Sequence, residues 1–113
     1  MNRAYLTCGI IALSILAGCV PSKQEYAAIQ ETVRGSAKAR KFALSKCMSG
    51  WNAVQRKNAS IILDTSEKAA PQIACSRAVE AVRSGKLDYQ DIVDIKRGKI
   101  TPKLVKIFQG RKV

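Results

Sequence analysis

The N-terminal apolar run determines how much of this chain is available to fold. Arg3 gives the chain a positive start, and residues 4–17 are apolar apart from three weakly polar side chains. A membrane-spanning helix needs roughly 20 apolar residues, so this run is too short to span a bilayer comfortably. A positive start followed by a short apolar run and small residues is typical of a secretory signal. We therefore expect residues 1–18 to be cleaved, which leaves about 95 residues for one small domain.

The apolar run ends at Leu16-Ala17-Gly18-Cys19. This tetrapeptide resembles the lipobox of bacterial lipoproteins. The resemblance implies that a diacylglyceryl group is transferred to the Cys19 thiol and that the chain is cleaved between Gly18 and Cys19. It also implies acylation of the new α-amine, with palmitate among the expected acyl groups. The resemblance covers about the first twenty residues and points to no specific lipoprotein family.

The expected location follows from this modification. Two or three acyl chains would hold the protein on a bilayer far more firmly than one chain does, so membrane lipid is the partner expected at Cys19. The second residue of the mature chain would be Val20 rather than Asp, which in lipoproteins of the enteric type implies the outer membrane, on its periplasmic side. The inner membrane remains an alternative. So does an ordinary cleaved signal, or an uncleaved anchor in which Cys19 is only a small apolar residue.

Two cysteines are left for the folded domain once those in the signal and at the expected lipidation site are set aside. The chain has four; Cys8 lies in the signal and Cys19 is assigned to lipid. In an oxidising compartment the remaining pair, Cys47 and Cys75, predicts one disulfide. Such a bridge would stabilise a small core by roughly 3 to 4 kcal/mol. Two buried free thiols are the alternative. A metal site is not expected, because two distant thiols in a chain without histidine offer too few ligands.

The first half of the mature chain predicts two helices. Residues 19–22 would form a short lipidated tether and residues 23–113 a single domain. Ser22 and Glu25 match a capping box for a helix that extends to Arg34. Residues 37–54 predict a second helix, in which Gly50 is a weak point or an end. The expected buried faces are Tyr26, Ile29 and Val33 on the first helix, and Ala37, Leu44, Cys47, Trp51 and Val54 on the second.

The second half predicts further, shorter helices. Residues 60–63 are interpreted as an apolar patch in a connection. Pro71 suits a first helical turn, and a face made of Ile73, Cys75, Ala78, Val79 and Val82 follows it before Gly85. Two more helix starts are expected. Asp88 and Asp91 match a capping box with a staple between Leu87 and Ile92, and Thr101-Pro102 begins the last helix, with Ile100 stapled to Val105. The fold class is therefore all-α: a bundle of about four to five helices braced by a Cys47–Cys75 disulfide.

The C-terminal segment, residues 96–113, is strongly basic. The whole chain has a formal net charge of +12, and no acidic residue follows Asp94. On an envelope protein such a surface would attract membrane lipid phosphates, other anionic envelope components or a protein partner. A solvated face that only keeps the protein soluble is the alternative. The candidate anionic-partner surface consists of Lys96, Arg97, Lys99, Lys103, Lys106, Arg111 and Lys112.

Other activities have less support in the sequence. The spacing around Gly98 invites comparison with the DNA-binding helix-turn-helix, but Asp94 and Lys99 occupy positions where that motif needs small or apolar residues, and no nucleic acid is expected. No catalytic residue or cofactor is predicted, because the chain lacks histidine and Asp88, Asp91 and Asp94 are explained by capping and by the positive helix start. A Ser–Lys nucleophile is the alternative, although no serine lies in a recognisable nucleophile motif. A deep pocket for a small molecule is not expected, since most of the mature chain's aromatic residues fall on presumed core faces: Tyr26, Phe42, Trp51, Tyr89 and Phe108.

Two functions from different classes remain. The first is a membrane-anchored interaction or accessory protein that uses its cationic helical surface and is not an enzyme. The second is a small enzyme acting on cell-wall polymer, or an inhibitor of such an enzyme.

Overall fold

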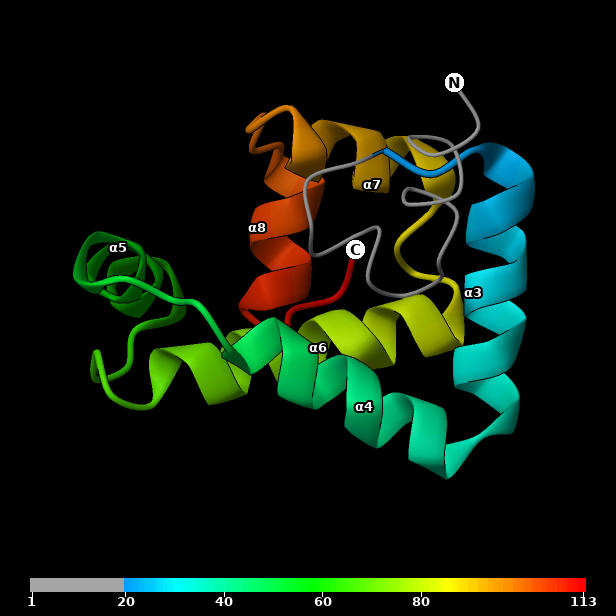
Figure 1. Cartoon of the computed structure of the whole chain (residues 1–113). Coiled ribbons are helices and arrows are strands. Elements are labelled where there is room, and N and C mark those ends of the chain that lie inside the picture. Colours follow the sequence, from blue (N-terminus) through cyan, green and yellow to red (C-terminus); the bar gives the residue numbers. More distant parts are fainter. Residues whose placement is uncertain (1–19) are drawn as a thin grey trace, which may run out of the picture.

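A computed structural model describes residues 20–113, and every regular element in that part of the chain is a helix (Figure 1). The all-α class is confirmed, although this part of the chain forms six helices rather than four or five. They are α3 (Lys23–Gly35), α4 (Ala37–Met48), α5 (Ala53–Leu63), α6 (Ala70–Ser84), α7 (Tyr89–Lys96) and α8 (Pro102–Phe108).

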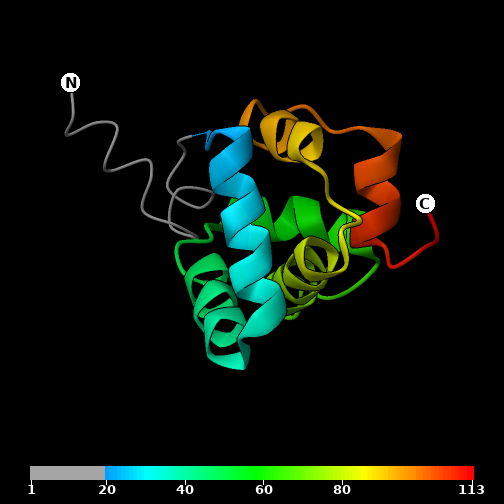
Figure 2. The same cartoon turned by 90° about the vertical axis from the view of Figure 1, so that its right-hand side faces the viewer.

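Helix α6 is the element against which the others pack. It contacts α3, α4, α5 and α8. Helix α7 lies across one end of the molecule, between the start of α3 and the start of α8 (Figures 1 and 2). The buried cluster joins residues from α3, α6, α7 and α8 with the connection before α7: Tyr26, Ile29, Val33, Ala81, Val82, Leu87, Ile92, Leu104 and Ile107.

Helix α3 forms as its sequence predicts. The Ser22 hydroxyl accepts a hydrogen bond from the Glu25 backbone N–H at 3.1 Å, and the Glu25 carboxylate accepts one from the Ser22 N–H at 2.7 Å. These two bonds satisfy N–H groups that a helix start leaves without partners. The predicted apolar face of Tyr26, Ile29 and Val33 is buried.

The last two helices also start where predicted. Asp88 and Asp91 form the reciprocal capping box of α7, and Leu87 and Ile92 are both buried in the core. The Thr101 hydroxyl accepts from the Leu104 N–H at the start of α8. Gly98, just after α7, adopts a φ of 74°, a left-handed conformation that costs glycine little because it has no Cβ.

Helix α6 has the predicted start and end. Pro71 lies in its first turn, where no intrahelical N–H bond is lost, and Gly85 ends the helix with a φ of 85°. Of the predicted apolar face, Cys75 and Val82 are buried, whereas Ile73, Ala78 and Val79 are half-buried.

The helix predicted over residues 37–54 does not run its full length: it ends just before Gly50, the position at which the sequence allowed an end. Helix α4 ends at Met48, and Gly50 takes a φ of 83° in the turn that follows. Asn52 then caps a new helix, because its side chain accepts from the Gln55 N–H while the Gln55 side chain accepts from the Asn52 N–H. Val54 belongs to this new helix, and 67% of it is exposed to solvent.

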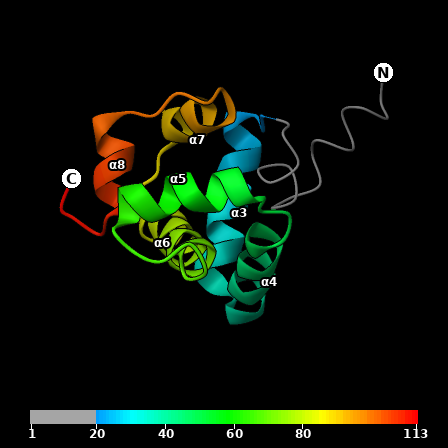
Figure 3. The same cartoon turned by 90° about the vertical axis from the view of Figure 1, so that its left-hand side faces the viewer.

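The segment 60–63 is likewise helical rather than a connection. It forms the last turn of α5, which runs along the outside of the molecule (Figure 3). Ile61 is 70% exposed, so this part of the patch does not cover the core as expected. Neither α4 nor α5 contains a buried residue.

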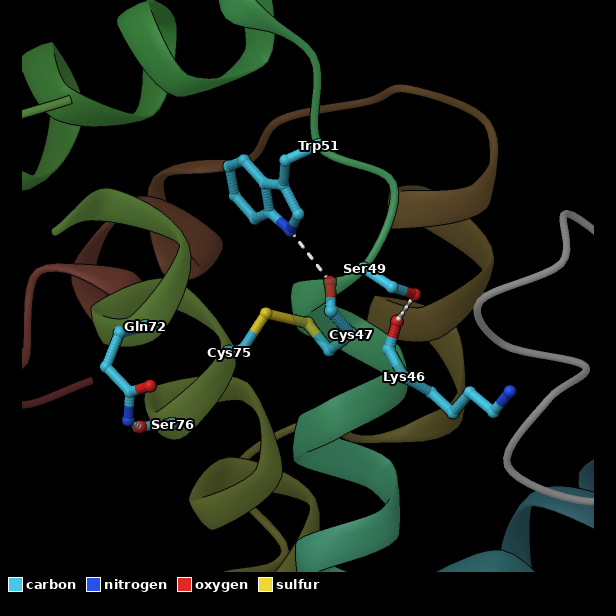
Figure 4. The surroundings of a disulfide bond; sticks show 7 residues. All are labelled: Lys46, Cys47, Ser49, Trp51, Gln72, Cys75 and Ser76. Atoms are coloured by element: carbon cyan, nitrogen blue, oxygen red, sulfur yellow. Dashed lines mark hydrogen bonds between the residues drawn. A yellow bond between two sulfur atoms is a disulfide. The ribbon is translucent and has the colours of Figure 1, made fainter. Parts of the chain in front are cut away.

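The predicted disulfide joins α4 to α6. Cys47 and Cys75 are 28 residues apart in sequence, and their Cα atoms are 5.8 Å apart. Figure 4 shows Trp51 folding back over this bridge, where its indole N–H donates to the Cys47 carbonyl oxygen at 2.7 Å. The bridge and this hydrogen bond therefore fix the α4–α5 connection relative to α6.

Candidate functional site

The described chain begins in contact with α7. Pro21 is buried, and the Tyr89 hydroxyl donates to its carbonyl oxygen at 2.8 Å. The chain therefore enters the fold at the end of the molecule that α7 covers (Figure 1). The predicted signal, residues 1–18, lies outside the described residues, as do the cleavage residue Gly18 and the lipidation residue Cys19.

Lys103 is part of the fold rather than a free surface cation. Its ammonium nitrogen lies 2.7 Å from a carboxylate oxygen of Asp91 and 3.3 Å from one of Asp88. The hydrogen bond to Asp91 is the main cause that raises the pKa of Lys103. The hydrogen bond from the Asp91 backbone N–H is the main cause that lowers the pKa of Asp88, and the hydrogen bond from Lys103 lowers it further. This ion pair joins α8 to the first turn of α7, so Lys103, although partly exposed, is already paired with carboxylates and is not a free cation of the predicted anionic-partner surface.

Tyr26 lies next to this carboxylate pair. Its hydroxyl donates to the Leu87 carbonyl oxygen. Burial raises the pKa of Tyr26 to about 12, and the negative charges of Asp88 and Asp91 add to the increase. The phenol is therefore a neutral hydrogen-bond donor at physiological pH, and it attaches α3 to the connection before α7.

The acidic residues of α7 have partners inside the fold. Asp94 is buried, and its carboxylate accepts from the Gln90 amide at 3.0 Å. Asp88 and Asp91 are held by the cap and by Lys103. Within residues 20–113, no three His, Cys, Asp or Glu side chains are grouped so that they could hold a metal ion.

The remaining members of the predicted basic surface fall into two groups. We call Lys96, Arg97 and Lys99 the basic connection, because they end α7 and lead to α8. Lys96 is half-buried, which lowers its pKa, whereas Arg97 and Lys99 are exposed. Ile100, which follows them, is 63% exposed. The second group, Lys106, Arg111 and Lys112, is exposed along α8 and beyond it.

The basic connection and the chain entry share one end of the molecule. Three views related by turns about one axis show the start of α3, helix α7 and the α7–α8 connection together at that end (Figures 1, 2 and 3). Helix α8 then runs back towards α6, which carries Arg111 and Lys112 away from this end. The structure thus divides the seven predicted cations into Lys103, which is paired with Asp88 and Asp91, and two separate groups, the basic connection and Lys106, Arg111 and Lys112.

Arg77 is a basic residue that sequence reasoning missed. Its guanidinium donates to the Phe108 carbonyl oxygen at 2.6 Å, across 31 residues of sequence. Phe108 is the last residue of α8, where carbonyl groups lack helical partners and the helix dipole is negative. Arg77 therefore caps α8 from α6, and no local sequence pattern marks it.

An apolar hollow lies beside the Trp51 side chain. It has a volume of about 550 Å³ and is lined by residues of α5, α6, α7 and α8 and of the connections next to them. A second cavity of about 260 Å³ lies between α3, α4, α6 and α7. Four residues line both spaces, which are therefore adjacent: Trp51, Ala74, Ile95 and Phe108.

The lining of these two spaces is chemically simple. None of the residues that line them carries a titratable side chain, since Cys47 is held in the disulfide. The few polar side chains, Ser49, Gln55 and Asn58, all line the larger space. The sequence did not predict these two spaces, which are partly open to the surface. Trp51 and Phe108, which were assigned to the core, form walls of a hollow that they do not fill.

Comparison with known proteins gave no match: no family model, curated protein sequence or solved structure resembles the chain. None of the helices among residues 20–113 has the length and apolar character needed to cross a membrane.

Proposed function

We propose that this chain is a lipid-anchored protein of the bacterial cell envelope, an interaction or accessory protein that holds its basic connection against anionic membrane lipid. The anchor would be Cys19, in the outer membrane on its periplasmic side. The observation that carries the proposal is the hydrogen bond between Tyr89 and the Pro21 carbonyl, because it fixes the chain entry beside α7.

The short distance from the expected anchor to the fold supports this orientation. An extended chain covers at most roughly 3.5 Å per residue, so two residues reach no more than about 7 Å. A lipid on Cys19 would therefore hold Pro21, and with it the α7 end, close to the bilayer surface. The basic connection occupies the same end (Figure 1).

The chemistry of that end fits an anionic bilayer. Each basic residue close to such a surface contributes about 1 kcal/mol of attraction, and Arg97 and Lys99 are exposed there. Ile100 offers an apolar side chain beside them. Exposed apolar residues on α4, such as Phe42 and Met48, lie outside this end and are available to an envelope protein partner.

The orientation can be measured with a reporter at the basic connection. The Ile100→Cys variant is purified as the acylated protein, labelled with a polarity-sensitive fluorophore and reconstituted into vesicles of neutral phosphatidylcholine, with or without phosphatidylglycerol. We expect a blue-shifted emission only in the anionic vesicles. The shift should fall at high salt, because salt screens exposed charges.

Two charge variants of the labelled protein serve as a matched pair. Arg97→Glu with Lys99→Glu should abolish the shift. Lys38→Glu with Lys41→Glu, which makes the same change of net charge on exposed α4 residues at the opposite end, should preserve it. Equal emission in both vesicle types, or equal loss in both variants, would contradict the proposal. Cys19→Ser should prevent incorporation of radioactive palmitate, which tests the anchor separately.

A further inference from the structure

Contacts between the surrounding elements hold the walls of the hollow beside Trp51 in place. The disulfide holds α4 against α6, and the Trp51 indole N–H is already bonded to the Cys47 carbonyl. The Arg56 guanidinium donates to the Trp51 carbonyl oxygen at 2.7 Å. On the other side, the Gln109 amide donates to the Ile62 carbonyl and ties the end of α5 to the end of α8.

The apolar character of the lining residues determines which molecules this space can hold. An ordered water needs two to four polar partners, and outside Ser49, Gln55 and Asn58 the lining supplies no polar side chains apart from the Trp51 indole N–H, which is already bonded. Unfilled apolar cavities accept apolar molecules. The larger hollow, at about 550 Å³, falls within the usual size of ligand pockets. The cavity of about 260 Å³ lies next to it, since the two share four lining residues, and it extends the apolar surface towards α3 and α4. Apolar surface on this scale suits a flexible hydrocarbon chain.

The rim of the hollow meets the basic connection. Ile95 and Ile100 both line the hollow, and Lys96, Arg97 and Lys99 lie between them in the chain. A ligand whose apolar part occupied the hollow would therefore have positive charge beside its exit. This arrangement favours an anionic head group on the ligand.

We propose that this hollow binds one long acyl chain that carries an anionic head group, with the chain against Trp51 and Phe108 and the head group beside Lys99. The site is distinct from the bilayer contact proposed above, because it concerns one molecule inside the fold. It remains testable in neutral vesicles, where the electrostatic attraction of the basic connection to lipid is absent.

The probe is a long-chain fatty acid with a photoreactive diazirine in the middle of its chain. The protein is mixed with phosphatidylcholine vesicles, irradiated with the probe, digested and mapped by mass spectrometry, and the experiment does not require that Cys19 is acylated. We expect saturable adducts on residues that line the hollow, above all in the segments around Trp51 and 95–108. The same probe made as a fatty alcohol should give the same sites with several-fold lower occupancy, because it lacks the anionic head.

Variants that fill the hollow test the site directly. Ala74 lines both spaces, so Ala74→Leu should reduce the adducts several-fold. Ala59→Leu, at a half-buried position on α5, is a second filling variant if the first folds poorly. Ala28→Leu adds the same volume on the exposed face of α3 and should change nothing. The proposal is overturned if adduct yield is the same in all three variants, or if adducts map outside the hollow.

Discussion

The α3–α7–α8 side of the molecule and the α4–α5 side are held in different ways. The first side buries large apolar residues: Leu87, Ile92 and Leu104 are each no more than 2% exposed. On the second side neither helix has a buried residue, and α4 is attached to α6 through the disulfide. One side is thus stabilised by burial of apolar surface, and the other by a covalent bond together with polar caps.

The largest effect should come from removing the bridge. Cys47 is half-buried, so Cys47→Ala removes the disulfide with little loss of packing. We expect a loss of about 3.5 kcal/mol in the free energy of unfolding, because the bridge closes a loop of nearly thirty residues. Amide hydrogen exchange should accelerate more in α4 and α5 than in α7 and α8. Ser45→Ala, on the exposed face of α4, is the control, and uniform acceleration in all helices would remove the distinction between the two sides.

A smaller loss should follow from a truncation in the core. Leu104→Ala should lower the free energy of unfolding by about 3 kcal/mol, because it leaves a cavity between α8 and its neighbours. Ile61→Ala on α5 removes a comparable side chain that is 70% exposed, and we expect little change. Denaturant unfolding of both variants measures the contrast. Similar losses would mean that Ile61 packs against something in solution.

The smallest of these effects concerns the ion pair between α7 and α8. Lys103→Met should cost about 1 kcal/mol near neutral pH, since the lysine is partly exposed and solvent weakens the pair. The pKa of Asp88 is lowered in the fold, so its contribution is complete above the unfolded pKa of about 3.9 and is lost as pH falls through the lower folded pKa. The difference between wild type and variant should therefore shrink in acid. A difference that does not change with pH would show that the effect of Lys103 does not come from its pairing with Asp88 and Asp91.

The sequence predicts the elements whose caps lie within three residues of each other. Ser22 with Glu25, and Asp88 with Asp91, each form a local capping box, so the starts of α3 and α7 can be found without the structure. The Asn52–Gln55 box carries an equivalent signal. It was missed because Trp51 and Val54 continue the spacing of the preceding helix across the break.

The candidate site depends on contacts that no local pattern encodes. Lys103 reaches Asp88 across 15 residues, and Arg77 reaches Phe108 across 31. The hollow is even harder to predict from the sequence than these contacts are. Its walls are mostly apolar residues of a kind that also fills protein cores, and they come together from α5, α6, α7 and α8 only in the folded structure. Side-chain type predicts that Trp51 avoids water, but it does not predict whether protein atoms fill the other face of its ring.

The Tyr89–Pro21 hydrogen bond also limits how far the protein can act. The fold measures 41 Å along its longest axis, and almost no free chain separates it from the proposed anchor. If the proposed anchor is present, the protein would reach only a few nanometres from its membrane. A partner that lies farther away would then have to extend towards the membrane surface for the two to make contact.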